Sequence, residues 1–141
     1  MRSRASLPGL RQSALTEGPL DVLQFLDFDV SEDAHGTVAW EAMASPLPQH
    51  NMVLLAELTG LLQRLHAAHG PPGPLDEQHG WDCDLHVASD QGTPLAWQWQ
   101  GQQIQWTWPD ASMPDTRLTV SLSLSGHAAF THTLEQEITD P

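Results

Sequence analysis

Residues 94–109, PLAWQWQGQQIQWTWP, constrain the fold more than any other stretch of the chain. If Gly101 and Gln102 form a two-residue turn with Gly first, as a type II′ hairpin prefers, the register of the flanking strands is fixed. The facing pairs are then Trp99 with Ile104, Trp97 with Trp106 and Leu95 with Trp108. Both strands sort their apolar side chains onto one face at this register, and a slip of one residue would mix the two faces. The segment therefore predicts a β-hairpin with one apolar and one polar face.

Alternation of apolar and polar residues predicts four further strands, each with one wet face. They lie at residues 21–30, 37–44, 81–87 and 118–125, and the turn residues SEDAHG join the first two as a hairpin. The first strand places Val22, Leu26, Phe28 and Val30 on one side. Asp27 and Asp29 fall on the other side, which we expect to face water.

Two helices complete the pattern. Leucines at three- and four-residue spacing predict an amphipathic helix over about residues 48–69, which Gly70 and the two following prolines end. Gly60 lies inside it, at a cost of about 1 kcal/mol relative to Ala unless something packs close to that backbone. A shorter helix near the C-terminus is expected to bury Phe130, Leu134 and Ile138.

The predicted order is β-β-α-β-β-β-β-α. Six strands with one polar face each, and two helices with one apolar stripe each, indicate an α+β fold in which both helices cover one side of an antiparallel sheet. The length of 141 residues suits one domain. We expect a single α+β domain over residues 20–141, preceded by a disordered or irregular arm at 1–19.

The charge is strongly one-sided. The chain has 18 Asp and Glu, five Arg and no Lys, for a net charge of −13. This balance argues against nucleic-acid binding, which depends on clustered cations. A basic protein is the partner that such a field would attract, although an acidic surface is also simply well solvated.

Location is inferred from the apolar pattern and the cysteine count. No apolar run approaches the roughly 20 residues of a membrane helix, and the first sixteen residues lack the apolar core of a signal peptide. Cys83 is the only cysteine, so no intrachain disulfide can form. We therefore expect a cytoplasmic protein that has no membrane association.

Acidic side chains on the outward parities form the first candidate site. Its members are Asp27, Asp29, Glu41, Asp82, Asp84 and His86. Close carboxylates can bind a divalent cation or work as an acid–base pair. An open sheet face offers no pocket by itself, which favours a solvated or protein-binding surface.

A metal site is the second candidate. His66, His69, His79 and Cys83 are possible zinc ligands within eighteen residues, but their spacing is not that of a finger or ribbon. Histidines at a helix C-terminus are already favoured by the helix dipole. Cys83 falls on an inward parity, where a thiol packs as a small apolar group. We expect no cofactor.

Four of the six tryptophans stand at alternate positions in one hairpin, and they form the third candidate site. Exposed indoles could stack on sugar rings or hold a peptide, whereas the polar glutamine face opposite them favours burial of the tryptophans. G-x-S-x-G, Gly-rich phosphate loop and H-E-x-x-H motifs are missing, so no catalytic residue is assigned. This favours a protein without enzymatic activity but does not decide the question.

Three stretches resemble a family of short, acidic, uncharacterised bacterial proteins with no assigned activity. They are DFDVSEDAHGTVAWEAMAS at 27–45, PPGPLDEQHGWDCDL at 71–85 and LTVSLSLSGHAAF at 118–130. The resemblance implies a bacterial cytoplasmic source and no functional residue. The sequence thus favours a non-enzymatic protein-binding module. The alternatives are a Trp-lined domain for a small ligand or sugar, and an enzyme or metal-binding protein that uses the sheet-face residues.

Overall fold

The computed structural model describes residues 23–77 and 79–139, so the predicted arm at 1–19 lies outside the described residues. The strands are β1 (Asp29–Glu32), β2 (Val38–Ala44), β3 (Trp81–Ser89), β4 (Ala96–Gln100), β5 (Gln103–Thr107) and β6 (Leu118–Gly126). The helices are α1 (Asn51–His69) and α2 (Ala128–Thr139), with short 3-10 helices η3 (Pro48–His50), η4 (Leu75–Glu77) and η5 (Met113–Asp115). The α+β class and the predicted element order are confirmed.

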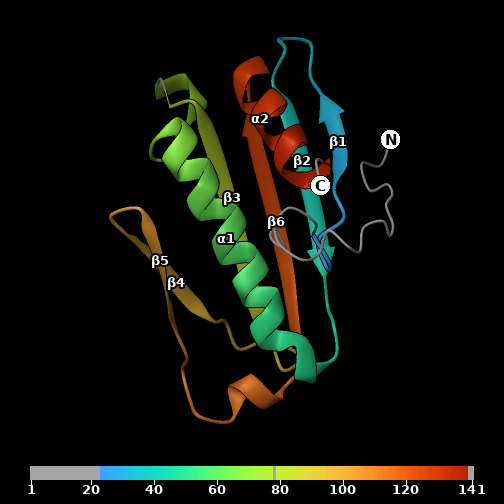
Figure 1. The fold of residues 1–141 in the computed structure, drawn as a ribbon. Coiled ribbons are helices and arrows are strands. Elements are labelled where there is room, and N and C mark those ends of the chain that lie inside the picture. The colour runs from blue at the N-terminus through green and yellow to red at the C-terminus, as the bar shows by residue number, and fades with distance from the viewer. Residues whose placement is uncertain (1–22, 78, 140–141) are drawn as a thin grey trace, which may run out of the picture.

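The six described strands divide into two antiparallel sheets. Four of them form a sheet in the order β1-β2-β6-β3, and both helices lie on one side of it (Figure 1). β4 and β5 pair only with each other, and this two-stranded ribbon extends beside α1. The predicted single sheet of about six strands is therefore a four-stranded sheet plus a ribbon.

The ribbon has the predicted register. Trp97 lies opposite Trp106, and Trp99 lies opposite Ile104. Gly101 begins the turn with a φ of 63°, a left-handed conformation that glycine adopts at little cost. Local turn chemistry and apolar alternation therefore sufficed to specify this pairing.

The first strand is shorter than predicted. β1 begins at Asp29, and the preceding residues lie against α1 without pairing as a strand. The backbone N–H groups of Gln24, Phe25 and Leu26 donate to the Glu57 carboxylate on α1, with shortest distances of 2.6, 3.1 and 2.9 Å. Leu26 is buried as expected, whereas Val30 at the sheet edge remains exposed.

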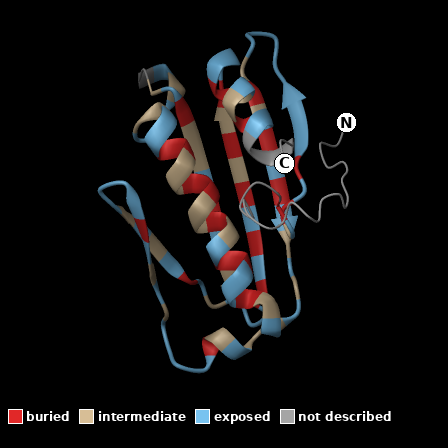
Figure 2. Cartoon of the chain, in the orientation of Figure 1, coloured by how far each residue is buried: buried red, intermediate tan, exposed pale blue. Residues whose placement is uncertain are grey.

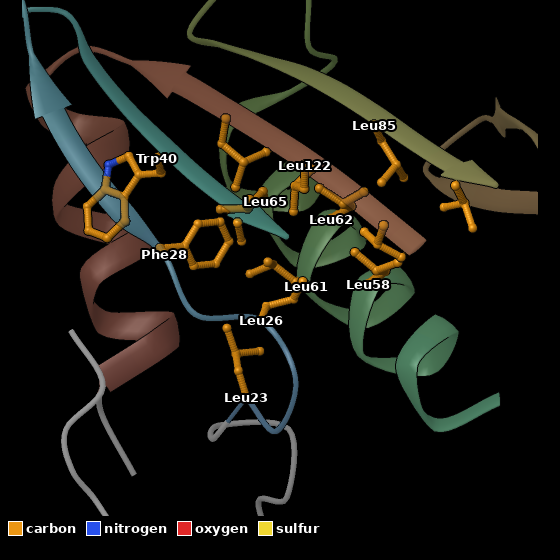
Figure 3. Close-up of a cluster of buried hydrophobic side chains, with 14 of the residues drawn as sticks. Leu23, Leu26, Phe28, Trp40, Leu58, Leu61, Leu62, Leu65, Leu85 and Leu122 are labelled. Atoms are coloured by element: carbon orange, nitrogen blue, oxygen red, sulfur yellow. The ribbon is translucent and has the colours of Figure 1, made fainter. Parts of the chain in front are cut away.

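The core lies between α1, α2 and the inner face of the four-stranded sheet (Figures 2 and 3). The predicted leucine stripe of α1 supplies one side, and none of these residues is more than 4% exposed: Leu54, Leu55, Leu58, Leu61, Leu62 and Leu65. Phe130 and Leu134 of α2 are buried as predicted, and the side chain of Ile138 lies outside the described residues. In the described part of the chain, neither helix is long and apolar enough to span a membrane.

Candidate binding surfaces

The face of the four-stranded sheet away from the helices carries the predicted acidic side chains. Antiparallel pairing places Asp29 opposite Glu41, Glu41 opposite Ser123, and Ser123 opposite Asp84. These four residues lie in one row that crosses all four strands. Because neighbouring strands are about 4.8 Å apart, the three carboxylates of this row span roughly 15 Å. We call the outer face that holds this row the open face.

The other predicted members lie on or beside this row. Asp82 is opposite Ser125 and His86 is opposite Ser121, so both belong to strand β3 on the open face. Asp27 is exposed but precedes β1, which corrects its predicted place within a strand. The register therefore brings five of the six predicted residues onto one sheet face.

One close contact links two of these side chains. His86 Nε2 lies 2.9 Å from Asp84 Oδ1, and both side chains are about three-quarters exposed, at 75% and 74%. The pair becomes a salt bridge only when the imidazole is protonated, and at such exposure it contributes little to stability.

The predicted metal ligands point to different neighbours. His66 packs on Trp99 with ring centroids 4.8 Å apart, and His69 packs on Phe130 at 5.4 Å. His79 Nδ1 lies 3.3 Å from the carbonyl of Pro71, and Cys83 packs against the core. Among the described residues, no three His, Cys, Asp or Glu side chains are grouped as a metal ion would require.

Cys83 has the inward position that its parity predicted. Burial raises the pKa of its thiol to about 12, and the neighbouring Asp82 and Asp84 add to the shift. The thiolate is the nucleophilic and metal-binding form of cysteine, so this environment suppresses both kinds of chemistry.

The four ribbon tryptophans pack against the core but remain half-buried. Trp106 Nε1 donates to the Thr59 hydroxyl of α1 at 2.9 Å, and Trp97 Nε1 donates to the Leu85 carbonyl of β3 at 3.0 Å. The predicted apolar face of the ribbon thus turns toward α1 and one edge of the sheet. Its burial is incomplete because the ribbon leaves the four-stranded sheet.

An open groove of about 470 Å³ lies where the ribbon meets α1. We call it the α1–β5 groove, and its lining residues are Met52, Leu55, Ala56, Thr59, Gly60, Trp106 and Trp108. Sequence reasoning did not find it. The one sequence feature that bears on it is Gly60, a glycine inside a helix, which lines the groove together with Trp106 and Trp108.

Comparisons of the chain with protein-family models, with curated proteins and with solved structures found no match.

Proposed function

We propose that this chain is a non-enzymatic recognition module whose open face binds a basic protein. The observation that carries the proposal is the row of carboxylates, Asp29, Glu41 and Asp84, which the strand register aligns across the sheet. A partner surface with Arg or Lys side chains at matching intervals would meet several carboxylates at once. Such matching favours specificity and fast association.

The side chains between the carboxylates suit this role. Ser121, Ser123 and Ser125 of β6 form the middle of the face, and they are short enough to let a partner approach the sheet. Of the described arginines, Arg117 lies at the end of the face next to β2, where its Nη2 donates to the Ser45 carbonyl at 2.6 Å. Arg64 is on α1, across the sheet from the open face. The field at the face is therefore negative, and it would steer a cationic partner toward the sheet.

The setting we propose is the bacterial cytoplasm. The family resemblance of the three stretches at 27–45, 71–85 and 118–130 supports a bacterial source. The single cysteine supports a reducing compartment, where proteins seldom rely on disulfides.

Charge reversal on the open face tests the proposal. The variant Glu41→Lys/Asp84→Lys is compared with Asp76→Lys/Glu135→Lys, which has the same net charge but changes exposed residues of η4 and α2. The probe is a folded basic protein, cytochrome c, and the measurement is its association rate by stopped flow at several salt concentrations. We expect the wild-type rate to fall steeply as salt rises, because screening removes the steering.

The open-face variant should associate with cytochrome c about tenfold more slowly than the control variant at low salt. Equal rates for the two variants would mean that only net charge matters, and the proposal would be wrong. A wild-type rate that does not depend on salt would count against it equally.

A further inference from the structure

The α1–β5 groove follows the axis of α1. Its helical residues are Met52, Leu55, Ala56, Thr59 and Gly60, at positions i, i+3, i+4, i+7 and i+8 of one helix face. At 1.5 Å per residue this stretch is about 12 Å long, or a little over two turns. Trp106 of β5 and Trp108, just beyond the end of β5, form the facing wall. The groove is therefore long enough for two side chains that are one helical turn apart.

The groove is apolar. Its helical side has the small residues Ala56 and Gly60, and its other wall consists of indole rings. The Thr59 hydroxyl, its main polar atom, already accepts the Trp106 N–H. A sugar or a polar metabolite needs several convergent hydrogen-bonding groups, so this lining is better suited to aliphatic or aromatic side chains. Met52, 62% exposed, and Val53, 47% exposed, extend the apolar surface toward the start of α1.

The rim at that end is acidic. The loop after Trp108 carries Asp110 and Asp115. This loop is attached to the start of α1, because Asn51 Nδ2 donates to the carbonyls of Pro114 and Thr116 at 2.8 and 2.7 Å. Bonds to Asp110 from the Ser112 hydroxyl and backbone N–H lower the pKa of this carboxyl, so it is ionised at neutral pH. The described residues contain two cations near this region: Arg64, about one turn beyond Gly60 on α1, and Arg117, which follows the loop and donates to the Ser45 carbonyl. The described residues have no other Arg or Lys, and the net charge of the chain is −13.

We infer that the α1–β5 groove is a docking site for a cationic amphipathic helix, separate from the open face. Two bulky apolar side chains of the helix would occupy the groove, and its Lys or Arg side chains would lie near Asp110 and Asp115. A second copy of this chain is a poor occupant, because it would bring a net charge of −13 and the same two carboxylates to the contact. The inference does not depend on the open-face proposal.

The test uses the full chain labelled with ¹⁵N and a synthetic peptide of Leu and Lys. The peptide has about 14 residues, or four turns, with Leu on one helical face. A scrambled peptide of the same composition has no apolar face. We expect the amphipathic peptide to shift the indole N–H signals of Trp106 and Trp108, and to do so even in about 0.5 M NaCl, where charge interactions are screened. The scrambled peptide should leave both signals unchanged in that salt.

Two matched variants separate apolar docking from charge attraction. Ala56→Glu puts a carboxylate into the groove, and Ala68→Glu puts one at another exposed alanine of α1, outside the lining. Both variants gain the same charge, which would strengthen a purely electrostatic complex. We expect Ala56→Glu to bind the amphipathic peptide about tenfold more weakly than Ala68→Glu. Equal affinity of the two variants, or no shift at Trp106 and Trp108 in the wild type, would overturn the inference.

Discussion

The indole N–H of Trp97 bonds to the Leu85 carbonyl at 3.0 Å, at the point where a backbone N–H would continue the pairing of β4 with β3. Ala88 lies opposite Pro94, and Leu95 N donates to the Val87 carbonyl at 2.8 Å. Continuing this antiparallel register would put the backbone of Trp97 opposite Leu85. A side chain takes that place instead, and β4 departs from the sheet. The bond also covers part of an edge strand that would otherwise offer a free carbonyl to another chain.

Replacing the indole tests this relationship. Trp97→Phe retains an aromatic ring but loses the N–H donor, so the Leu85 carbonyl loses its hydrogen bond from the indole. We expect the free energy of unfolding to fall by about 1 kcal/mol, and the amides of the ribbon to exchange faster with solvent. Denaturant unfolding and hydrogen exchange measure the two effects. Trp108→Phe, beyond the end of β5, is the control for the smaller ring, and an equal loss in both variants would contradict the role of the bond.

The same bond shows where sequence reasoning stops. The turn at Gly101 and the matching apolar parities determined the register within the ribbon, and β4 and β5 pair accordingly. A period of two tells which face a side chain takes, but it does not tell which strand lies alongside. β4 leaves the sheet where Trp97 meets Leu85, and these residues are twelve positions apart.

The open face could be predicted from local sequence patterns, whereas the groove could not, because it depends on how two elements pack together. Outward parity alone places Glu41 and Asp84 on the solvent side, whichever strands pair. The groove needs two elements, α1 and the ribbon, to meet at an angle that no local pattern specifies. The predicted strand at 21–30 was too long because Glu57, about thirty residues later, takes the N–H groups that the strand pattern assigned to a sheet.

Glu57 should therefore be important for attaching the segment before β1. Glu57→Ala removes the acceptor of three backbone N–H groups, and we expect a loss of about 2 kcal/mol in the free energy of unfolding. Glu57→Gln retains one acceptor oxygen and should lose about half as much. Denaturant unfolding measures both, with Glu32→Ala on the exposed β1 as a control that changes stability by about 0.5 kcal/mol or less. Fast amide exchange at Leu26 in the wild type would contradict the attachment.

Gly126 is expected to tolerate no side chain. A Cβ on this residue, at the end of β6, would lie 2.6 Å from Cγ of Phe130, which is buried and stacked on Trp81. Gly126→Ala should therefore destabilise the fold by about 2 kcal/mol, since the ring has little space to move. Gly80→Ala is the matched control, because its Cβ would meet the His69 carbonyl at an ordinary 3.7 Å. Thermal or denaturant unfolding compares them, and equal stabilities would show that the ring can shift freely.

His69 should make stability depend on pH. Its Nε2 is buried without a hydrogen-bond partner among the described residues, and desolvation lowers the pKa of its imidazole below the ordinary 6.5. Between the lowered pKa of the folded protein and the ordinary 6.5 of the unfolded chain, the unfolded chain binds more protons at His69. The contribution of the neutral His69 to stability is therefore complete above pH 6.5, and it is lost as the pH falls from 6.5 through the folded pKa. His69→Phe should show a shallower decline than the wild type, measured by denaturant unfolding at several pH values. Equal slopes for His69→Phe and the wild type would contradict this role of His69.

Cys83 should react slowly with thiol reagents while the protein is folded. Its thiol has a pKa raised to about 12, first by burial and then by Asp82 and Asp84. At pH near 8 the thiolate fraction is then about a thousandfold smaller than that of free cysteine, and the rate with Ellman's reagent should fall by a similar factor. The same protein unfolded in guanidinium provides the control, because its thiol should react at the ordinary rate. Cys83 lies opposite Leu124 of β6 and packs against the core. A folded-state rate close to the unfolded one would therefore mean that β3 opens to solvent readily at this position, and it would contradict the burial of the thiol.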